Sequence, residues 1–171
     1  FKKALGGDIG KSLCENDRIS TCRKILSNAE KMGVKIHLPQ DSIVADSFSA
    51  TAATRVSESD QIDSGWMGLD IGPKASEKFS RVIADSKTIL WNGPMGVFEM
   101  PPFEEGTKTV ANAVAEATKN GAYSLIGGGD SAAAAKKFNV DLQISHVSTG
   151  GGALLEFFEG KILPGIAAIE R

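Results

Sequence analysis

Cysteine is scarce in this sequence, and long apolar runs are missing from it. Two cysteines among 171 residues are too few for the disulfide framework that holds many small secreted domains together. Cys14 and Cys22 lie eight residues apart on one predicted helix, which separates them by about 12 Å and prevents them from pairing. We therefore expect two reduced thiols in an intracellular protein. No apolar run reaches the length of a membrane span, so we expect no membrane partner.

Net charge is also small, at −2 from 19 basic and 21 acidic side chains. A nucleic-acid-binding surface normally shows a basic face or stripe, so this balance argues against such a partner. It remains compatible with a nucleotide, because backbone N–H groups at the start of a helix bind phosphate without any lysine. With 42% apolar and 23% charged residues, the chain has the composition of an ordinary globular domain.

The chain does not begin with methionine, and its first five residues are typical of the last turn of a helix that Gly6 and Gly7 end. We therefore expect a segment to precede residue 1 in the natural protein. The sequence shows no signal peptide. The cytoplasm is the expected compartment, and a plastid protein that had lost its transit peptide would look the same.

Helical and strand patterns alternate along the chain. Apolar residues at three- and four-residue spacing predict helices, and short apolar runs bounded by glycine, proline or asparagine predict strands. The predicted helices cover residues 15–32, 73–85, 104–119, 131–138 and 153–158. The predicted strands cover residues 34–38, 43–45, 66–71, 88–91, 122–126 and 144–147, and residues 47–64 form an irregular excursion that is extended near 55–57.

This alternation predicts an α/β fold with three layers, in which a mostly parallel, Rossmann-like sheet lies between helices. We read residues 1–171 as one domain. Ligands of such sheets bind outside the carboxyl ends of the strands. Three predicted strands end in glycine-rich or Asn-Gly-Pro loops, so these loops should lie together at one edge.

One of these loops joins a predicted strand to the last predicted helix and contains Ser148, Thr149, Gly150, Gly151 and Gly152. Glycine lets the backbone approach a ligand closely, and the following helix supplies unpaired N–H groups at the positive end of its dipole. The loop therefore predicts an anion site, where the two hydroxyl residues cap the helix or bind the anion. The alternative is a tight turn with an ordinary cap.

A second loop repeats the arrangement with Gly127, Gly128, Gly129, Asp130 and Ser131. Two such loops in one chain strengthen the phosphate interpretation of both. A carboxylate beside phosphates is repelled unless a cation or a hydrogen-bond donor separates them. Asp130 would therefore meet Mg²⁺, a ribose or a phosphate-bound water, and its alternative role is the N-cap of the helix.

Two further segments suit the remainder of a nucleotide. The loop at residues 91–99 contains Asn92, which can donate and accept hydrogen bonds, and Glu99, which can accept from ribose hydroxyls. The alternative for Glu99 is a solvated surface charge. The apolar segment at residues 65–70 could form a wall for a flat adenine, and its alternative is a core strand.

Together these segments resemble a known family. Residues 65–73, 91–99, 126–131 and 146–152 are similar, in order and spacing, to the carboxy-terminal nucleotide-binding domain of phosphoglycerate kinases. Shorter pieces at residues 10–13, 38–39 and 155–165 also fit, and the resemblance extends over essentially the whole chain. It implies that this domain is incomplete at its start.

The resemblance implies a reversible phosphoryl transfer between 1,3-bisphosphoglycerate and ADP, giving 3-phosphoglycerate and ATP with Mg²⁺, in a protein that is a monomer at full length. Gly68 and Leu69 would line the adenine site, Asn92 would lie near the phosphates and Glu99 on the ribose. The residues expected to hold the phosphates and the metal are Gly128, Gly129, Asp130 and Ser131, with Asp130 as the metal ligand. The residues expected to stabilise the transferring phosphoryl group are Gly150, Gly151 and Gly152.

Several parts of the family pattern are missing from this chain. The phosphoglycerate-binding domain with its basic patch and catalytic arginine is not present, and neither is a Gly-Ala-Lys segment with nucleotide-binding lysines. We therefore expect residues 1–171 alone to be inactive, with weak nucleotide affinity. Two alternatives stay open, namely a nucleotide- or anion-binding module without chemistry and a degenerate homologue retained for protein interaction.

Overall fold

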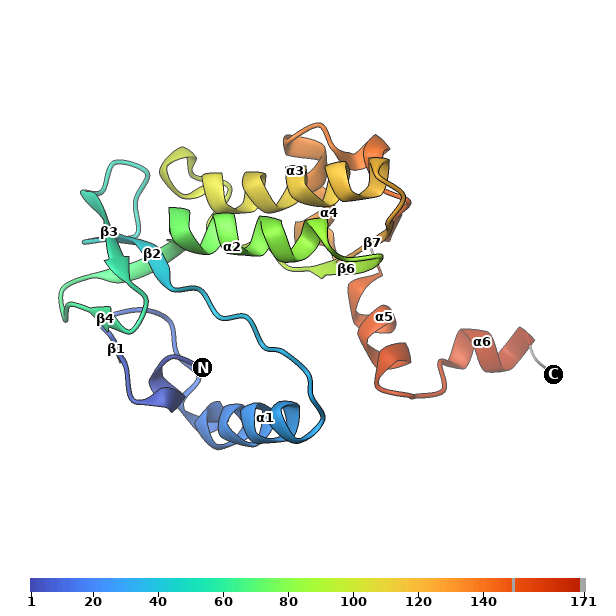
Figure 1. The fold of residues 1–171 in the computed structure, drawn as a ribbon, viewed down its shortest axis with the longest axis horizontal. Coiled ribbons are helices and arrows are strands. Elements are labelled where there is room, and N and C mark those ends of the chain that lie inside the picture. Colours follow the sequence, from blue (N-terminus) through green and yellow to red (C-terminus); the bar gives the residue numbers. More distant parts are fainter. Residues whose placement is uncertain (149, 170–171) are drawn as a thin grey trace. The chain divides into compact units, whose positions relative to one another are not determined.

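The computed structural model describes residues 1–148 and 150–169, along which helices and strands alternate (Figure 1). The chain forms two compact units. Unit 1 contains Phe1–Val82 with Met95–Val110, and unit 2 contains Ile83–Pro94 with Ala111–Arg171. The α/β class predicted from the sequence is confirmed, whereas the assignment of all residues to one domain stays a prediction. No helix in the described ranges is both long enough and apolar enough to cross a membrane.

Unit 1 contains two small sheets. Strand β2 (Asp41–Ala45) lies between β3 (Thr54–Glu58) and β5 (Met67–Ile71) and pairs antiparallel with both. Strands β1 (Asp8–Ile9) and β4 (Gln61–Ile62) form a parallel pair. The helical segments are η1 (Lys3–Leu5), η2 (Asn16–Arg18), α1 (Ile19–Lys31), η3 (Pro101–Phe103) and the beginnings of α2 (Pro73–Ala84) and α3 (Glu105–Lys119).

Unit 2 contains one parallel sheet, in the order β6 (Thr88–Asn92), β7 (Tyr123–Gly127) and β8 (His146–Ser148). The register pairs the last residue of β6 with the last residue of β7, and that residue with the last one of β8, so all three strands end at the same edge. This confirms the expected grouping of the three loops. The helical segments are α4 (Gly129–Lys137), η4 (Asp141–Gln143), α5 (Gly151–Phe158), α6 (Pro164–Ile169) and the ends of α2 and α3.

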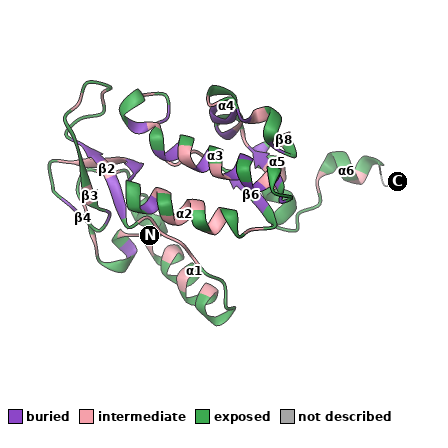
Figure 2. Cartoon of the chain, turned by 45° about the horizontal axis from the view of Figure 1, so that its top comes forward, coloured by how far each residue is buried: buried purple, intermediate pink, exposed green. Residues whose placement is uncertain are grey.

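The buried core of unit 2 follows from the residue pattern of its strands and helices. In β6 the alternation is complete, with Ile89 and Trp91 buried and their neighbours exposed, as expected for a strand with one face on the core. Ile126 of β7 is fully buried, and so are Ala134 and Ala135 of α4, whose small side chains let the helix lie close to the strands. Figure 2 shows buried residues gathered in β2, in β6 and along one side of α3.

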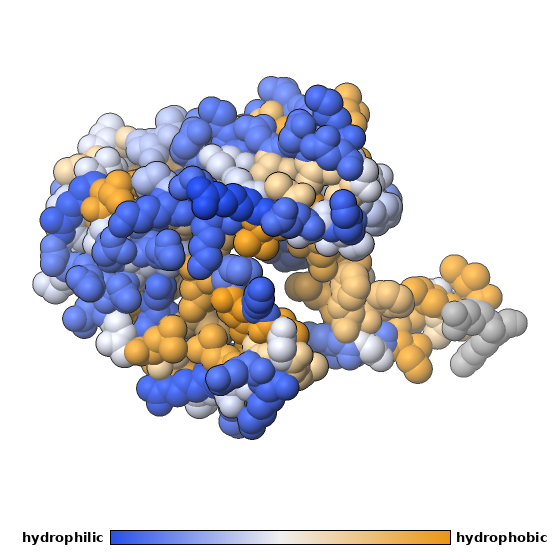
Figure 3. All heavy atoms as spheres, viewed as in Figure 1, coloured by the Kyte–Doolittle hydropathy of each residue, from blue (hydrophilic) through white to orange (hydrophobic). Residues whose placement is uncertain are grey.

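Apolar side chains remain exposed on the last two helices. Figure 3 shows hydrophobic residues over α6, and most of the large apolar residues from α5 onward are exposed, namely Leu155, Phe157, Phe158, Ile162, Ile166 and Ile169. Contiguous apolar surface of this kind is typical of regions that contact other protein.

One predicted strand is wrong. Residues 34–39 form neither helix nor strand, and no strand in the described part of the chain pairs with them. A strand requires a neighbouring strand for its ladder of hydrogen bonds. The apolar pattern of residues 34–38 was therefore not enough to predict a strand. The predicted helix at 15–32 becomes a 3-10 turn followed by α1, which places Cys14 before the helix and Cys22 within it; both are free thiols.

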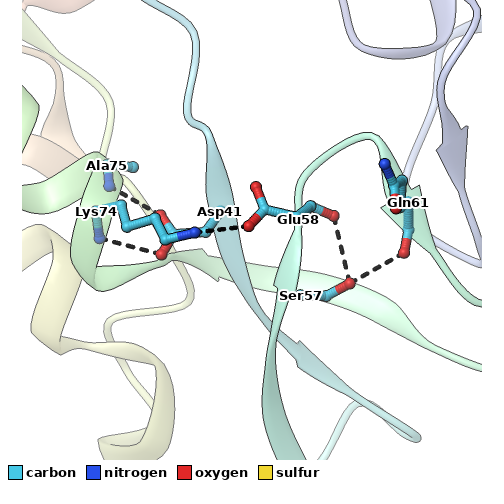
Figure 4. Close-up of polar contacts among 6 residues, drawn as sticks. All are labelled: Asp41, Ser57, Glu58, Gln61, Lys74 and Ala75. Atoms are coloured by element: carbon cyan, nitrogen blue, oxygen red, sulfur yellow. Dashed lines mark hydrogen bonds and ion pairs between the residues drawn. The ribbon is translucent and has the colours of Figure 1, made fainter.

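A buried carboxylate joins β2 to the start of α2 (Figure 4). Asp41 is fully buried, and its two oxygens accept hydrogen bonds from the backbone N–H groups of Lys74 (3.0 Å) and Ala75 (2.8 Å). These donors belong to the first turn of α2, whose N–H groups have no acceptor within the helix. A Cβ at Gly72 would overlap the carboxyl group, so glycine is required there. On the exposed side, Lys74 Nζ lies 2.7 Å from Glu58.

Asp70 of β5 plays the corresponding role for α3. It is 5% exposed, and its carboxylate accepts hydrogen bonds from the N–H groups of Gly106 (2.7 Å) and Ile71 (2.8 Å). Burial raises the pKa of Asp70 from 3.8 to about 6, against the lowering effect of the two N–H donors, and the charge of Glu105 raises it further. Unit 1 therefore contains a carboxyl group that titrates in the mildly acidic range.

The substitution Asp70→Asn should change how stability depends on pH. The native state keeps the Asp70 proton up to about pH 6, whereas the unfolded chain releases it near pH 3.8, so the contribution of this group to stability falls as pH rises between these values. We compare the free energy of unfolding of the wild type with that of the variant. Their difference, wild type minus variant, should fall by up to about 1.4 kcal/mol per pH unit between pH 3.8 and about pH 6, and should be constant above about pH 6. Urea unfolding of both proteins from about pH 4 to about pH 7 measures this difference. A difference that is independent of pH contradicts the raised pKa.

Candidate functional site

Two helices of unit 2 begin at the edge where the strands end. Helix α4 begins at Gly129 and α5 at Gly151, directly after the loops that leave β7 and β8. The carbonyl groups of Gly128 and Gly150 accept the first hydrogen bonds of these helices, so helix geometry leaves the N–H groups of each first turn without an intrahelical partner. Both N-cap residues are glycines, and neither provides a side-chain cap. The edge therefore presents backbone donors that suit an anion.

The two loops are in direct backbone contact. A Cβ added to Gly151 would lie 2.6 Å from the Cα and 2.8 Å from the N of Gly128. Gly128 itself has φ +96°, a conformation that L side chains rarely adopt. By contrast, a Cβ on Gly129 or Gly152 would have no heavy atom within 4 Å. Gly151 is thus required by packing and Gly128 by its positive φ, whereas Gly129 and Gly152 face open space that a ligand could enter.

Asn92 ends β6 beside both loops. Its side-chain nitrogen Nδ2 lies 3.2 Å from the position of a Cβ added to Gly127 and 3.5 Å from the position of one added to Gly151. The structure therefore brings together one polar side chain and both glycine loops, as the sequence predicts. The hydroxyl of Ser148 accepts a hydrogen bond from the N–H of Gly150 at 3.2 Å, and Thr149 lies outside the described residues.

Asp130 is exposed in the first turn of α4. It does not cap the helix, because Gly128 occupies the N-cap position. Within the described ranges, no three His, Cys, Asp or Glu side chains gather into a metal-binding cluster. Mg²⁺ is usually held by one or two carboxylates, with substrate phosphates and water completing its coordination. A single exposed carboxylate beside two helix N-termini fits that kind of site.

Ser131 is expected to hold nucleotide phosphate together with Gly128, Gly129 and Asp130, and its side chain faces the interior of unit 2. It is fully buried, and its Oγ accepts a hydrogen bond from the N–H of Gly93 at 2.6 Å. The carbonyl of Gly93 in turn accepts a hydrogen bond from Trp91 Nε1 at 2.7 Å. The hydroxyl therefore forms part of the support of the Asn92 loop, and only the backbone of Ser131 belongs to the first turn of α4.

The remaining predicted residues belong to unit 1. Gly68 and Leu69 are half-buried in β5, where the N–H of Gly68 donates to Ser12 Oγ at 2.9 Å. The carbonyl of Leu69 accepts a hydrogen bond from the N–H of Val97 at 2.9 Å. This bond attaches the loop that carries the exposed Glu99 to β5. Unit 1 thus brings Gly68, Leu69 and the Glu99 loop together.

Sequence reasoning missed the side chains that hold these loops in place. The sequence pattern places Trp91 at the end of a strand and the start of the loop at residues 91–99, and does not indicate that its indole N–H reaches the following turn. The sequence pattern places Asp70 in an apolar wall or a core strand and does not indicate that it accepts the N–H of Gly106. The sequence did contain a signal for Asp70, namely a charged residue inside an apolar strand. A buried carboxylate needs hydrogen-bond donors that compensate for its lost hydration, so such a residue indicates donors nearby.

The fold and its loops define an α/β protein whose parallel strands run into helices through glycine-rich turns at one edge of the sheet. The sequence model of the phosphoglycerate kinase family matches residues 1–161, and the chain therefore belongs to the phosphoglycerate kinase family.

Curated and structural relatives agree with this assignment. The chain is 53% identical over 171 residues to a phosphoglycerate kinase from Rhodococcus erythropolis, covering 99% of this chain and 42% of the relative. It is 55% identical over 170 residues to one from Porphyromonas gingivalis, covering 99% and 41%. The phosphoglycerate kinase structure from Coxiella burnetii is similar with a TM-score of 0.89 at 46% identity, covering 94% of this chain and 41% of that one.

The enzyme structure from Pyrococcus horikoshii is similar with a TM-score of 0.74 at 30% identity, covering 99% of this chain and 42% of that one. The chain thus spans about two fifths of the length of the curated relatives it matches.

Adjacent glycines of α5 should respond differently to the same substitution. Gly151→Ala places a methyl group against the Gly128 backbone and should destabilise unit 2 by roughly 1–3 kcal/mol, as overpacking does. Gly152→Ala adds a methyl group to open space and should be neutral or stabilising by about 0.5–1 kcal/mol, the helix preference of alanine. Chemical denaturation of the two variants measures the contrast. Equal effects would contradict the close contact of the two loops.

Proposed function

We propose that the chain is the nucleotide-binding part of a phosphotransferase that acts in glycolysis and uses a carboxyl group as acceptor. The enzyme transfers a phosphoryl group reversibly between 1,3-bisphosphoglycerate and ADP, giving 3-phosphoglycerate and ATP. The observation that carries this proposal is the sheet edge of unit 2, where the N-termini of α4 and α5 start in backbone contact beside the Asn92 amide. Such an edge provides donors at fixed positions for phosphate oxygens.

The proposed roles follow the accessibility of each residue. The open glycines Gly129 and Gly152 let phosphate oxygens approach the first turns of α4 and α5. We assign the α4 loop with Gly128 to the nucleotide phosphates, and the α5 loop with Gly150 and Gly151 to the phosphoryl group in transfer. Phosphoryl transfer spreads negative charge over equatorial oxygens, so donors held in place before the reaction stabilise its transition state.

Asp130 is the residue proposed to hold the metal. Bound Mg²⁺ would neutralise charge on the phosphates, and the exposed carboxylate of Asp130 would keep it beside the α4 loop. The adenine is assigned to Gly68 and Leu69, and the ribose hydroxyls to Glu99. The exposure of Glu99 and the bond from Val97 to Leu69 support this assignment within unit 1.

Other parts of the proposed activity depend on residues outside this chain. The phosphoglycerate substrate and the cationic groups that neutralise the phosphates are assigned to the portion of the relatives that residues 1–171 do not match. Residues 1–171 alone are therefore proposed to lack catalysis, since the reaction needs both substrates enclosed. We propose a cytoplasmic monomer at full length, with ADP and ATP as its nucleotides and no nucleic-acid partner.

Asp130→Asn tests the proposal in the longest natural protein that contains residues 1–171. The variant should form ATP from 1,3-bisphosphoglycerate and ADP at least about tenfold more slowly, and should need more Mg²⁺, because it weakens one metal ligand. Asp85→Asn, at an exposed carboxylate after α2, is the matched control and should stay within about twofold. Coupled ATP assays across a Mg²⁺ titration measure both.

Three results separate the proposed enzyme from its alternatives. If the longest natural protein binds Mg·ADP but forms no ATP, it is a binding module. If it neither binds Mg·ADP nor forms ATP, it is a degenerate homologue. Residues 1–171 alone should form no ATP, and Mg·ADP should change their Trp66 and Trp91 fluorescence only near millimolar concentration. ATP formation by residues 1–171 alone would contradict the proposed need for the other substrate domain.

A further inference from the structure

Gly93 is held at both of its backbone polar atoms, which belong to the two peptide groups on either side of its Cα. Its N–H donates to Ser131 Oγ at 2.6 Å, and its carbonyl accepts from Trp91 Nε1 at 2.7 Å. Both side chains are fixed by burial, at 0% exposure for Ser131 and 5% for Trp91. Gly93 has φ +102°, which L side chains rarely adopt, so the turn depends on this glycine and on its two bonds. We call these two hydrogen bonds the Gly93 clamp.

The clamp acts on the residue that precedes it. Asn92 is exposed at the end of β6, and its side-chain nitrogen lies beside both glycine loops, 3.6 Å from a Cβ added to Gly128 and 3.5 Å from one added to Gly151. The backbone of Asn92 is part of the sheet on one side, where it pairs with Gly127, and is joined to the clamped peptide on the other. If either bond is lost, the chain can change direction at Gly93 and shift the end of β6, which would move the Asn92 amide away from the loops.

We propose that Ser131 and Trp91 are positioning residues, which fix the chain on both sides of Gly93 so that the Asn92 amide is presented between the two glycine loops. This inference rests on the proposed function, because the presented amide is assigned to nucleotide phosphate. It gives the Ser131 side chain a different role from a phosphate ligand. The hydroxyl contributes through Gly93 and Asn92, whereas the backbone of Ser131 contributes to the first turn of α4.

Deamidation of Asn92, which is followed by glycine, reports on the Gly93 clamp and can be measured without a nucleotide. In deamidation the Gly93 nitrogen attacks Asn92 Cγ, ammonia leaves and a succinimide forms, and water then opens the ring to aspartate or isoaspartate. The net change is asparagine plus water to aspartate plus ammonia, without an oxidant or a reductant. The attacking nitrogen must give up the hydrogen bond of its N–H to Ser131, so an intact clamp slows the reaction.

The experiment compares Ser131→Ala, Ser131→Thr and Trp91→Phe in the longest natural protein that contains residues 1–171. Ser131→Ala and Trp91→Phe each remove one clamp bond and should accelerate deamidation of Asn92 by about fivefold to tenfold, the factor expected for one lost buried hydrogen bond. Ser131→Thr keeps the hydroxyl and should stay near the wild-type rate. Peptide mapping by mass spectrometry follows deamidation during incubation at mildly alkaline pH.

The control variant is Ser80→Ala. Ser80 also lies in a helix, and its hydroxyl donates to the backbone carbonyl of Ser76 at 2.9 Å, far from Gly93 in the sequence. It should leave both the deamidation rate and the KM for Mg·ADP at wild-type values. The freshly prepared clamp variants should raise the KM for Mg·ADP more than they lower kcat, because a misplaced amide weakens phosphate binding. Circular dichroism and thermal unfolding verify that each variant is folded.

The outcomes separate the clamp from the proposed function. Unchanged deamidation in both Ser131→Ala and Trp91→Phe overturns the clamp. Faster deamidation with an unchanged KM for Mg·ADP overturns the positioning role of Ser131 and Trp91. A wild-type protein without measurable Mg·ADP binding overturns the proposed function and with it the assignment of Asn92, while the deamidation rates still decide the clamp itself.

Discussion

The backbone contact between Gly128 and Gly151 determines where the two helices of the candidate site begin. The parallel register of unit 2 ends its three strands level, and the missing Cβ of Gly151 lets α5 start against the loop that leads into α4. Two first turns with unpaired N–H groups therefore lie side by side. Donors of this kind do not depend on long, mobile side chains. Their positions follow from strand register and glycine packing, which is the preorganisation that charge stabilisation requires.

The same reasoning explains how much of the fold could be predicted from the sequence. Strands β6, β7 and β8 begin and end within two residues of the predicted bounds. The predicted runs of β6 and β7 are followed directly by Asn92 and Gly127, and that of β8 leads through Ser148 into a glycine loop. The apolar run at residues 34–38 has the same local pattern, but among the residues that the structure describes it has no pairing neighbour and forms no strand. Pairing is a non-local property, and the antiparallel pairing of β2 with both neighbours was equally invisible in the local pattern.

At the candidate site, the sequence located the backbone features better than the side chains. Triple glycines before apolar helices indicate close backbone approach, and the contact of the two loops agrees with that interpretation. The direction of a hydroxyl cannot be read from a motif. Ser131 resembles an exposed residue of a phosphate loop, yet it is the buried residue of an otherwise exposed start of α4, and its Oγ accepts a hydrogen bond from Gly93. Asp41 and Asp70 show the same limit, because their partners lie about 35 residues away in the sequence.

The position of Asp130 explains why a site of backbone donors would still need a cation. A carboxylate in the first turn of α4 is favourable for that helix, because it lies at the positive end of the dipole, and the last turn carries Lys136 and Lys137 at the negative end. A phosphate bound to the same turn would compete with Asp130 for this positive end and would be repelled by it. The conflict disappears when a divalent cation lies between the carboxylate and the phosphate oxygens. The charge pattern of α4 thus favours a metal-bound nucleotide over a free phosphate as the ligand of this edge.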